Sequence, residues 1–280
     1  WQGRDPYRPQ KQAELDEGGA LDQFAAALRR LPTVLDLRLR ALLLFNLWGN
    51  RADLSFEAMA QTAYAGLEEG QTQGLLIDQR EALCVRLRAG LGRVDFVNDN
   101  AGLELLFDLA LADCLLANGL AGQARFHLKS QPFFVSDAMI PDLYETLSRL
   151  AERPDLHGLA QRLREYLAEG RLSLASHPFW VTARGFDRMP AALVAELGSA
   201  DLVLFKGDAN YRRLLDDRAW PLSASLSECT AYLPFSFAAI RAIKAPLAVD
   251  LSEEQARRLD AADPQWMVNG QYGLIQFVAR

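Results

Sequence analysis

The sequence predicts an α/β fold with a three-layer core, in which helices cover both faces of a mostly parallel sheet, plus a helical N-terminal part. Three observations support this class. Short β-prone runs pass repeatedly into a polar loop and then into a helical pattern, which is the order that parallel strands require. The first third of the chain carries apolar residues at helical spacing. Half of the 280 residues are hydrophobic and 24% are charged, which is typical of a globular protein and excludes a disordered chain.

The N-terminal part, residues 1–75, is expected to be mostly helical. Residues 1–20 are polar and punctuated by proline and glycine, which predicts an extended arm. Apolar residues then recur at helical spacing over 21–31 and 37–47, and a further helix is expected from Ser55 through Tyr64. The chain starts at Trp1 without an initiator Met, so we expect that a further N-terminal part of the natural protein precedes it.

The second part, residues 76–280, is expected to form the α/β core. Its strands and helices are predicted from β-prone runs and from helical spacing of apolar residues. We expect strands at 94–97, 124–128, 133–135, 172–175, 202–205, 239–244 and 274–278, and helices at 103–116, 141–150 and 211–215.

Charge and cysteine usage exclude several classes of partner and compartment. A net charge of −6 and a pI of about 5.2 give no general attraction to nucleic acid or to an anionic membrane surface. The most apolar region, 103–120, is interrupted by three acidic residues and cannot span a bilayer. Three scattered cysteines without a CxxC pair fit a reducing compartment, and the cytoplasm is expected: Cys84, Cys114 and Cys229.

Three aspartates follow predicted strands directly. Asp99 follows the run ending at Val97, Asp137 follows Val135, and Asp208 follows Phe205. Because ligands bind outside the carboxyl ends of parallel strands, these loops are expected to face one crevice. The alternative is that each aspartate caps the helix after it.

Oxygen ligands and basic residues in these loops suggest a site for a phosphate ester. Asp99, Asn100 and Asp137 form an all-oxygen set that suits a hard divalent ion such as Mg²⁺ or Mn²⁺. Arg212 can bind phosphate through two hydrogen bonds, and Lys244 adds a point charge. Ordinary surface solvation is the alternative for both basic residues.

Other candidates carry less information. The patterns GxGxxG, GxxxxGK[ST] and GxSxG are absent, which excludes the common nucleotide-binding and acyl-transfer motifs. His127, His157 and His177 are too scattered for a ligand motif, although His177 follows a predicted strand. The aromatic runs 133–134 and 235–237 are expected to lie in the core.

Four segments together resemble the damage-control phosphatase family, in the branch that includes the acidic residue methyltransferase-like proteins. They occur in the order of the family's motifs, and the resemblance extends from about Arg4 to Phe277. The segments are Leu47-Trp48-Gly49-Asn50-Arg51-Ala52-Asp53-Leu54-Ser55, Val97-Asn98-Asp99-Asn100-Ala101-Gly102-Leu103-Glu104-Leu105, Phe133-Phe134-Val135-Ser136-Asp137, and Lys206 to Arg212.

The resemblance implies a metal-dependent phosphatase acting on small phosphometabolites, including sugar phosphates such as fructose 1-phosphate. It implies that Asp99, Asn100 and Asp137 hold a divalent ion (Mn²⁺, Ni²⁺, Co²⁺ or Mg²⁺) in the core of residues 76–280. For phosphate ester hydrolysis at such a site we expect Asp208 to act in catalysis by orienting water or relaying a proton. Ala242 departs from the family's Arg-Thr-x-Lys motif, which bears on substrate preference. The implied substrate-binding residues are Asp99, Asn100, Asp208, Ala209, Asn210, Tyr211, Arg212 and Lys244.

Two other functions stay open at this point. An S-adenosylmethionine-dependent protein carboxyl (glutamate) methyltransferase is an activity also ascribed to relatives in this branch, but the sequence has neither a glycine-rich first loop nor an acidic ribose anchor. The other alternative is a non-catalytic metabolite sensor that keeps the pocket without the reaction.

Overall fold

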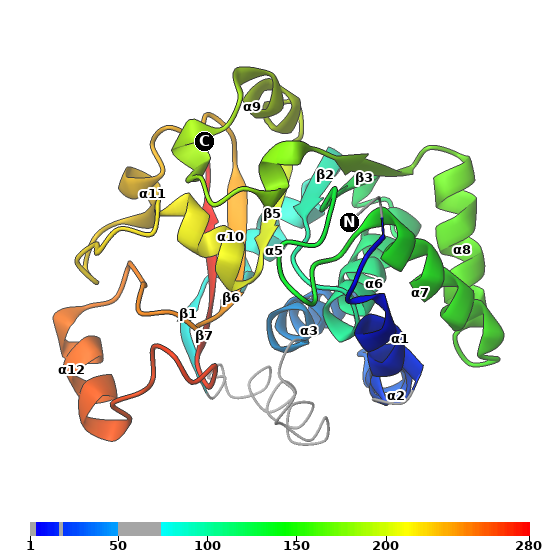
Figure 1. Cartoon of the computed structure of the whole chain (residues 1–280), viewed down its shortest axis with the longest axis horizontal. Helices are drawn as coiled ribbons and strands as arrows, with labels where there is room; N and C mark the ends of the chain where they lie inside the picture. Colours follow the sequence, from blue (N-terminus) through cyan, green and yellow to red (C-terminus); the bar gives the residue numbers. More distant parts are fainter. Residues whose placement is uncertain (1–3, 17–18, 50–73) are drawn as a thin grey trace.

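A computed structural model describes residues 4–16, 19–49 and 74–280, and it confirms the α/β class (Figure 1). Within these residues seven strands form one sheet in the order β1-β7-β6-β5-β2-β3-β4. The strands are β1 (Leu75–Asp78), β2 (Leu91–Val97), β3 (Ala121–Leu128), β4 (Leu172–Ser176), β5 (Leu202–Lys206), β6 (Phe237–Ala242) and β7 (Gly273–Val278).

The sheet is mostly parallel, and its topology defines where a ligand would bind. All neighbouring strands pair in parallel except β6 and β7, which are antiparallel. From β2 the chain builds outward through β3 to β4, then returns to β5 on the other side of β2 and continues to β6. The boundary between β2 and β5 is therefore a topological switch point, where the loops at the carboxyl ends of the strands diverge and leave a crevice.

Helices cover both faces of the sheet, as the three-layer prediction requires. One layer contains α1 (Arg8–Asp16), α2 (Ala20–Arg30), α3 (Leu35–Trp48), α5 (Arg80–Arg88), α6 (Leu103–Ala117), α7 (Ile140–Glu152) and α8 (His157–Ala168). The other contains η1 (Pro178–Val181), η2 (Phe186–Arg188), α9 (Ala191–Gly198), α10 (Gly207–Leu214), α11 (Leu226–Cys229) and α12 (Glu253–Ala262).

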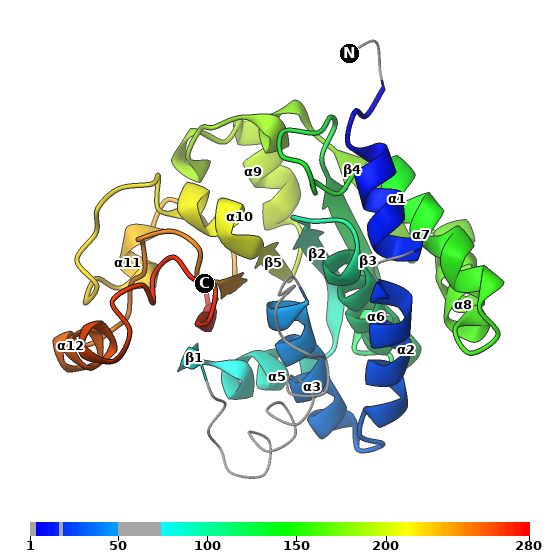
Figure 2. The ribbon, with the colours of Figure 1, turned by 60° about the horizontal axis from the view of Figure 1, so that its bottom comes forward.

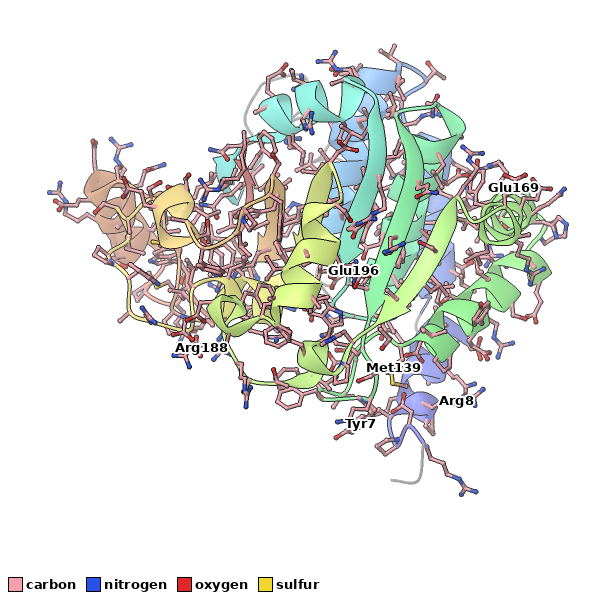
Figure 3. All side chains as sticks on the ribbon, turned by 90° about the horizontal axis from the view of Figure 1, so that it is seen from above. Tyr7, Arg8, Met139, Glu169, Arg188 and Glu196 are labelled. Atoms are coloured by element: carbon pink, nitrogen blue, oxygen red, sulfur yellow. The ribbon has the colours of Figure 1, made fainter. Side chains whose placement is uncertain are left out.

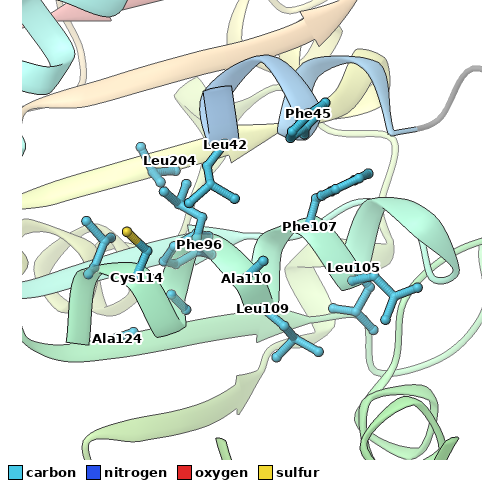
Figure 4. Packing of buried hydrophobic residues seen from close by; sticks show 14 of the residues in the cluster. Leu42, Phe45, Phe96, Leu105, Phe107, Leu109, Ala110, Cys114, Ala124 and Leu204 are labelled. Atoms are coloured by element: carbon cyan, nitrogen blue, oxygen red, sulfur yellow. The ribbon is translucent and has the colours of Figure 1, made fainter. Parts of the chain in front are cut away.

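The larger core cluster lies between the sheet and the first helical layer (Figure 4). Phe45 of α3 stacks on Phe107 of α6 with ring centroids 5.2 Å apart. Leu42 of α3 lies close to Phe96 of β2 in the same cluster. Since α6 is enclosed by the sheet and other helices, it is apolar almost all round, and two of its charged side chains, Glu104 and Asp108, are buried.

Most elements predicted for the core are present. The predicted strands at 94–97, 124–128, 172–175, 202–205 and 274–278 lie within β2, β3, β4, β5 and β7, and the run 239–244 overlaps β6, which ends at Ala242. The predicted helices correspond to α6, α7 and α10, although α10 begins earlier, at Gly207. The predicted helix from Ser55 to Tyr64 lies outside the described residues.

Two predictions were wrong. Residues 8–16 form helix α1 instead of part of an extended arm, because Pro9 stands in the first helical turn, where a missing N–H costs nothing. The run 133–135 is an exposed loop instead of a strand, for a reason given with the site. Figure 2 shows α1 alongside α7, and Figure 3 shows Tyr7 and Arg8 near Met139, at one end of the sheet.

No helix among the described residues combines the length and the apolar character that a membrane span needs.

Candidate active site

The carboxyl ends of the central strands bring the predicted site residues together. Val97 at the end of β2 pairs with Phe205 near the end of β5, so the loops that follow these strands start side by side. The loop after β3 and the segment after β6 reach the same edge, because both strands run parallel to their central neighbours. The expected convergence of distant loops on one crevice is therefore present.

The loop between β2 and α6 carries Asp99 and Asn100. It turns sharply at Gly102, whose φ of +69° lies in the region that favours glycine. Asn98 ties this loop to α6, because its Nδ2 donates to Oδ2 of Asp108 at 2.8 Å. Asp99 and Asn100 are both buried, so their side chains are held in place before any ligand arrives.

Asp137 explains why the run 133–135 is not a strand. Its Oδ2 accepts hydrogen bonds from the backbone N–H groups of Phe133 at 2.8 Å and Phe134 at 2.7 Å. In a strand, these N–H groups would donate to the carbonyls of a neighbouring strand. Here they donate to the carboxylate of Asp137, so the segment curls around that side chain instead. The side chains of Phe133 and Phe134 are 47% and 52% exposed, so the expectation that they lie in the core was also wrong.

Backbone hydrogen bonds join the two acidic loops. Ala101 donates to the carbonyl of Ser136 at 2.7 Å, and Ala138 donates to the carbonyl of Asp99 at 2.9 Å. The hydroxyl of Ser136 adds a 2.6 Å bond to Oδ1 of Asn100. Asp99, Asn100 and Asp137, which lie 38 positions apart along the chain at most, are therefore held as one rigid unit.

Lys129 lies between the two aspartates. Its Nζ is 3.3 Å from Oδ1 of Asp99 and 3.1 Å from Oδ1 of Asp137, and all three side chains are buried. Although burial alone would lower the pKa of Lys129, the carboxylates of Asp99 and Asp137 raise it above its ordinary value. Burial, and beyond it the charges of Glu104 and Asp137, raise the pKa of Asp99 to about 6 against the opposing effect of Lys129.

A second buried lysine neutralises two acids on α6. Nζ of Lys206 lies 2.8 Å from Oδ1 of Asp108 and 3.7 Å from Oε1 of Glu104. Burial raises the pKa of both of these carboxyls. This buried cluster therefore contains four carboxyl groups, Asp99, Glu104, Asp108 and Asp137, and two ammonium groups, which gives a formal excess of two negative charges when all six are ionised.

The donor chemistry of the cluster fits a divalent ion. An excess of two negative charges is what a divalent cation neutralises, and carboxylate and amide oxygens suit Mg²⁺ or Mn²⁺. Among the described residues, no three His, Cys, Asp or Glu side chains are grouped to hold a metal, so a site here depends on the amide of Asn100 beside Asp99 and Asp137. That amide lies beside the carboxylates, but its Nδ2 donates to Asp99 at 3.2 Å and to Glu104 at 2.9 Å while its Oδ1 accepts from Ser136, so the amide must rotate to offer its oxygen to an ion.

The chain after β5 fits closely against Asp99. Gly207 has a φ of +83°, and a Cβ at this position would lie 1.9 Å from Oδ2 of Asp99. Asp208 is held by two donors from the β6 side: Nε of Arg241 at 2.7 Å and the backbone N–H of Lys244 at 3.1 Å. Helix α10 thus begins at the site, with its first turn facing the acidic loops.

The remaining residues of the α10 segment have different surroundings. Arg212 is half-exposed and makes a two-bond ion pair with Asp217, with Nε 2.9 Å from Oδ1. Asn210 is buried and donates to the carbonyls of Lys206 at 2.8 Å and Val97 at 3.2 Å, which ties α10 to β2 and β5. Tyr211 is also buried, and the guanidinium of Arg241 lies 4.4 Å from its ring centroid.

A cavity of about 250 Å³ opens above this arrangement. Six of the predicted site residues line it, whereas Asn210, Tyr211 and Asp137 do not. Ala242, at the position where the motif departs from the family pattern, also lines it. The six are Asp99, Asn100, Asp208, Ala209, Arg212 and Lys244.

Comparison with known proteins identifies the family of this chain. Residues 1–259 match the family model described as the damage-control phosphatase ARMT1-like domain. The chain belongs to this family. Damage-control phosphatases ARMT1 from zebrafish (Danio rerio) and mouse are both 33% identical over 98% of this chain, and the human protein is 35% identical over 84% of it. These matches cover 67%, 68% and 58% of the relatives' own lengths, respectively.

A solved structure supports the fold of this ARMT1-like chain. A DUF89 family protein from Pyrococcus horikoshii superposes with a TM-score of 0.56 at 17% identity, covering 96% of this chain and 74% of that protein. The prediction of an enzyme of the phosphatase class is confirmed by the family and its named members. Damage-control phosphatases are in general dependent on a divalent metal.

Sequence reasoning missed three buried charged residues of this ARMT1-like site: Lys129, Lys206 as a partner of α6, and Glu104. Glu104 and Asp108 gave a signal, since acids that fall within the apolar surface of a helix need buried partners. Lys129 gave none, because a lysine just after a strand is usually solvated.

Proposed function

We propose that this ARMT1-like chain is a divalent-metal-dependent phosphatase that hydrolyses small phosphorylated metabolites, with sugar phosphates such as fructose 1-phosphate as the first substrates to test. One observation carries the proposal: the cavity that reaches Asp99 and Asn100 is also lined by the cations Arg212 and Lys244. Such a cavity offers oxygen ligands to a metal ion and positive charge to a phosphate group at the same place.

Asp99, Asn100 and Asp137 would hold the ion, which we take to be Mn²⁺, Ni²⁺, Co²⁺ or Mg²⁺. The excess negative charge of the buried cluster supports this set, as do the backbone bonds that fix the two loops to each other. When bound, such an ion supplies Lewis acidity at the phosphoryl oxygens.

The chain's own residues would bind and orient the phosphate. Lys244 and Arg212 neutralise charge on its oxygens, and the first turn of α10 presents backbone N–H groups to the same cavity. Asp208 lines the cavity with its carboxylate fixed by Arg241 and the Lys244 N–H, so it is oriented to hold a water molecule or accept its proton.

The buried asparagine and tyrosine of the α10 segment have a supporting place in this proposal. Asn210 fixes the start of α10 to the strand ends, and Tyr211 packs beneath Arg241. Their contribution to substrate binding is thus to hold Asp208 and Arg212 in register. We also infer a cytoplasmic location, which the three free cysteines support.

The test is phosphate release over a panel of sugar phosphates and divalent ions, with Asp99→Asn as the key variant. The substitution keeps the size of the side chain and removes its charge, and we expect kcat/KM to fall at least about 100-fold, because metal-ion catalysis contributes several kcal/mol. Asp155→Asn is the matched control, since Asp155 is paired with Arg29 and Arg153 on the surface.

Wild-type activity should also be abolished by a chelator and restored by added metal. Near wild-type turnover by Asp99→Asn in a metal-replete assay, or turnover that a chelator leaves unchanged, would refute the proposal. Calorimetry with S-adenosylmethionine should detect no binding to the same preparation.

A further inference from the structure

The cation Arg212 is held by the turn that ends its own helix. Helix α10 is closed by two backbone hydrogen bonds, from the N–H of Asp216 to the carbonyl of Arg213 at 3.3 Å and from the N–H of Asp217 to the carbonyl of Arg212 at 2.8 Å. This is the Schellman pattern, in which the residue after the C-cap takes a left-handed conformation and is usually glycine. The turn folds the chain back, so that Asp217 lies beside Arg212.

Two aspartates in succession take the left-handed conformation in this turn. The φ angles of Asp216 and Asp217 are +53° and +52°, and residues other than glycine are strained in this region. The ion pair between Asp217 and Arg212 is about half-exposed at both partners, and exposed ion pairs contribute little to stability. Stability therefore does not account for the strained turn, whereas strain of this kind is typical of functional sites.

The ion pair leaves one edge of the Arg212 guanidinium available to a ligand. The carboxylate of Asp217 binds the edge formed by Nε and Nη2, with Nε 2.9 Å from Oδ1. Within the described part of the chain, Nη1 makes no hydrogen bond. The edge formed by Nη1 and the second N–H of Nη2 can therefore donate two parallel hydrogen bonds to a phosphate, which is the geometry in which arginine binds this group best.

Arg212 faces the catalytic cavity, whereas its partner does not. Arg212 is part of the lining of that cavity and Asp217 is not, so Asp217 can stay in place when a phosphate binds. The neighbouring Arg213 differs, because all three of its guanidinium nitrogens donate to backbone carbonyls, at 2.8 to 3.1 Å. Of these two adjacent arginines, only Arg212 is held by a carboxylate with donors to spare.

We propose that Asp217 is a positioning residue of the active site, which holds Arg212 with its open edge toward the catalytic cavity. A long side chain loses rotational freedom when it binds a ligand, and fixing it beforehand reduces that loss. The hydrogen bond from Arg212 lowers the pKa of Asp217, so this carboxylate is charged at neutral pH. The inference rests on the proposed function, because it takes the ligand of the cavity to be a phosphate group.

The test measures the affinity for inorganic phosphate by calorimetry in the presence of Mn²⁺, together with kcat and KM for fructose 1-phosphate. Asp217→Asn keeps the size of the side chain and tolerates the left-handed backbone. Arg212→Lys keeps the charge and removes the fork, and the double variant combines the two changes. Asp216→Asn is the matched control, because it removes the same charge from the same turn, and Asp216 pairs with Arg218 instead.

We expect Asp217→Asn to weaken phosphate binding and to raise KM about three- to tenfold, with little change in kcat, because Arg212 is still present but has to be ordered by the ligand. Asp216→Asn should keep the wild-type affinity within about twofold. In the Arg212→Lys background, Asp217→Asn should have no further effect, since the two residues act as one unit.

Three results would overturn the inference: wild-type phosphate affinity in Asp217→Asn, an equal loss in Asp216→Asn, or a loss of the same size in the Arg212→Lys background. The first shows that Arg212 needs no support, the second that only the overall charge matters, and the third that Asp217 does not act through Arg212. The proposed function fails separately, if phosphate binds as expected but no phosphate ester is hydrolysed.

Discussion

The two acidic loops of the site show how differently the same residue can be held. In the loop after β2, Asp99 stands two residues beyond the strand and its carboxylate faces Lys129 and Gly207. In the loop after β3, Asp137 stands far beyond the strand, and one of its oxygens organises the loop itself by accepting two backbone N–H bonds. The first aspartate is placed by the sheet, whereas the second builds the loop that carries it.

The two loops also depend on different supports. The Asp99 loop needs the absence of a side chain at Gly207, which belongs to the segment after β5. The Asp137 loop is supported by α1, because Nζ of Lys11 donates to the carbonyl of Asp137 at 2.5 Å and is also paired with Asp142 at 2.8 Å and Asp5 at 2.9 Å. A substitution at Gly207 or at Lys11 can therefore disturb one loop while its aspartate is left unchanged.

Gly207→Ala should have the largest effect, because the new Cβ would lie 1.9 Å from Oδ2 of Asp99 and the backbone there has φ +83°. We expect kcat/KM to fall at least about 100-fold, the loss that removal of a metal ligand would cause. Gly90→Ala is the control, since Gly90 has φ +76° with open space around its Cβ position. Equal activity of the two variants would show that the close approach is unimportant.

Lys11→Met should disturb the other loop and have an intermediate effect. Removing the buried ammonium leaves Asp142 and Asp5 without their partner, which should cost about 3 kcal/mol of stability, and we expect Mn²⁺ affinity to fall about tenfold. Thermal unfolding and calorimetry measure the two effects. Arg8→Met is the control on the same helix, because Arg8 is exposed and pairs only distantly with Glu145 at 3.6 Å; if it lowers Mn²⁺ affinity as much, Lys11 has no specific role.

Glu14→Gln should have the smallest effect of the three substitutions. Its effect is on stability, and it should depend on pH. Glu14 is exposed as a residue, but its carboxyl lies against Gly102, and this local burial raises the pKa of that carboxyl above its ordinary value, against a hydrogen bond from the backbone of Leu103. Because the folded protein disfavours the charged form, the wild type loses stability as pH rises from about 4 through this pKa, and Glu14→Gln does not. The melting temperatures of the two proteins should therefore diverge in favour of the variant, by a few degrees at most, between pH 4 and pH 7; a constant difference would contradict the assignment.

The part of the site that lies at strand ends could be predicted from the sequence. Asp99 and Asp208 follow β-prone runs that are strands, and parallel order places both at the same edge of the sheet. The same logic put Asp137 beside Asp99, where it shares Lys129, but for a wrong reason: the apolar run before Asp137 has strand composition, yet its N–H groups donate to the Asp137 side chain.

The charge balance of the site could not be predicted, because it depends on contacts between distant residues. Lys206 reaches Asp108 and Glu104 from a neighbouring strand, and Lys11 reaches Asp137 from a helix that the sequence suggested to be an extended arm. Local patterns predict elements, whereas these pairings are set by tertiary packing.

The central claim is that the two acidic loops together hold one divalent ion. The most direct measurement is a crystal structure of the wild-type protein with Mn²⁺, with the ion located by its anomalous scattering. We predict one ion coordinated by side-chain oxygens of Asp99, Asn100 and Asp137. An ion bound elsewhere, or a fully Mn²⁺-saturated crystal in which Lys129 alone bridges the two aspartates, would contradict the account.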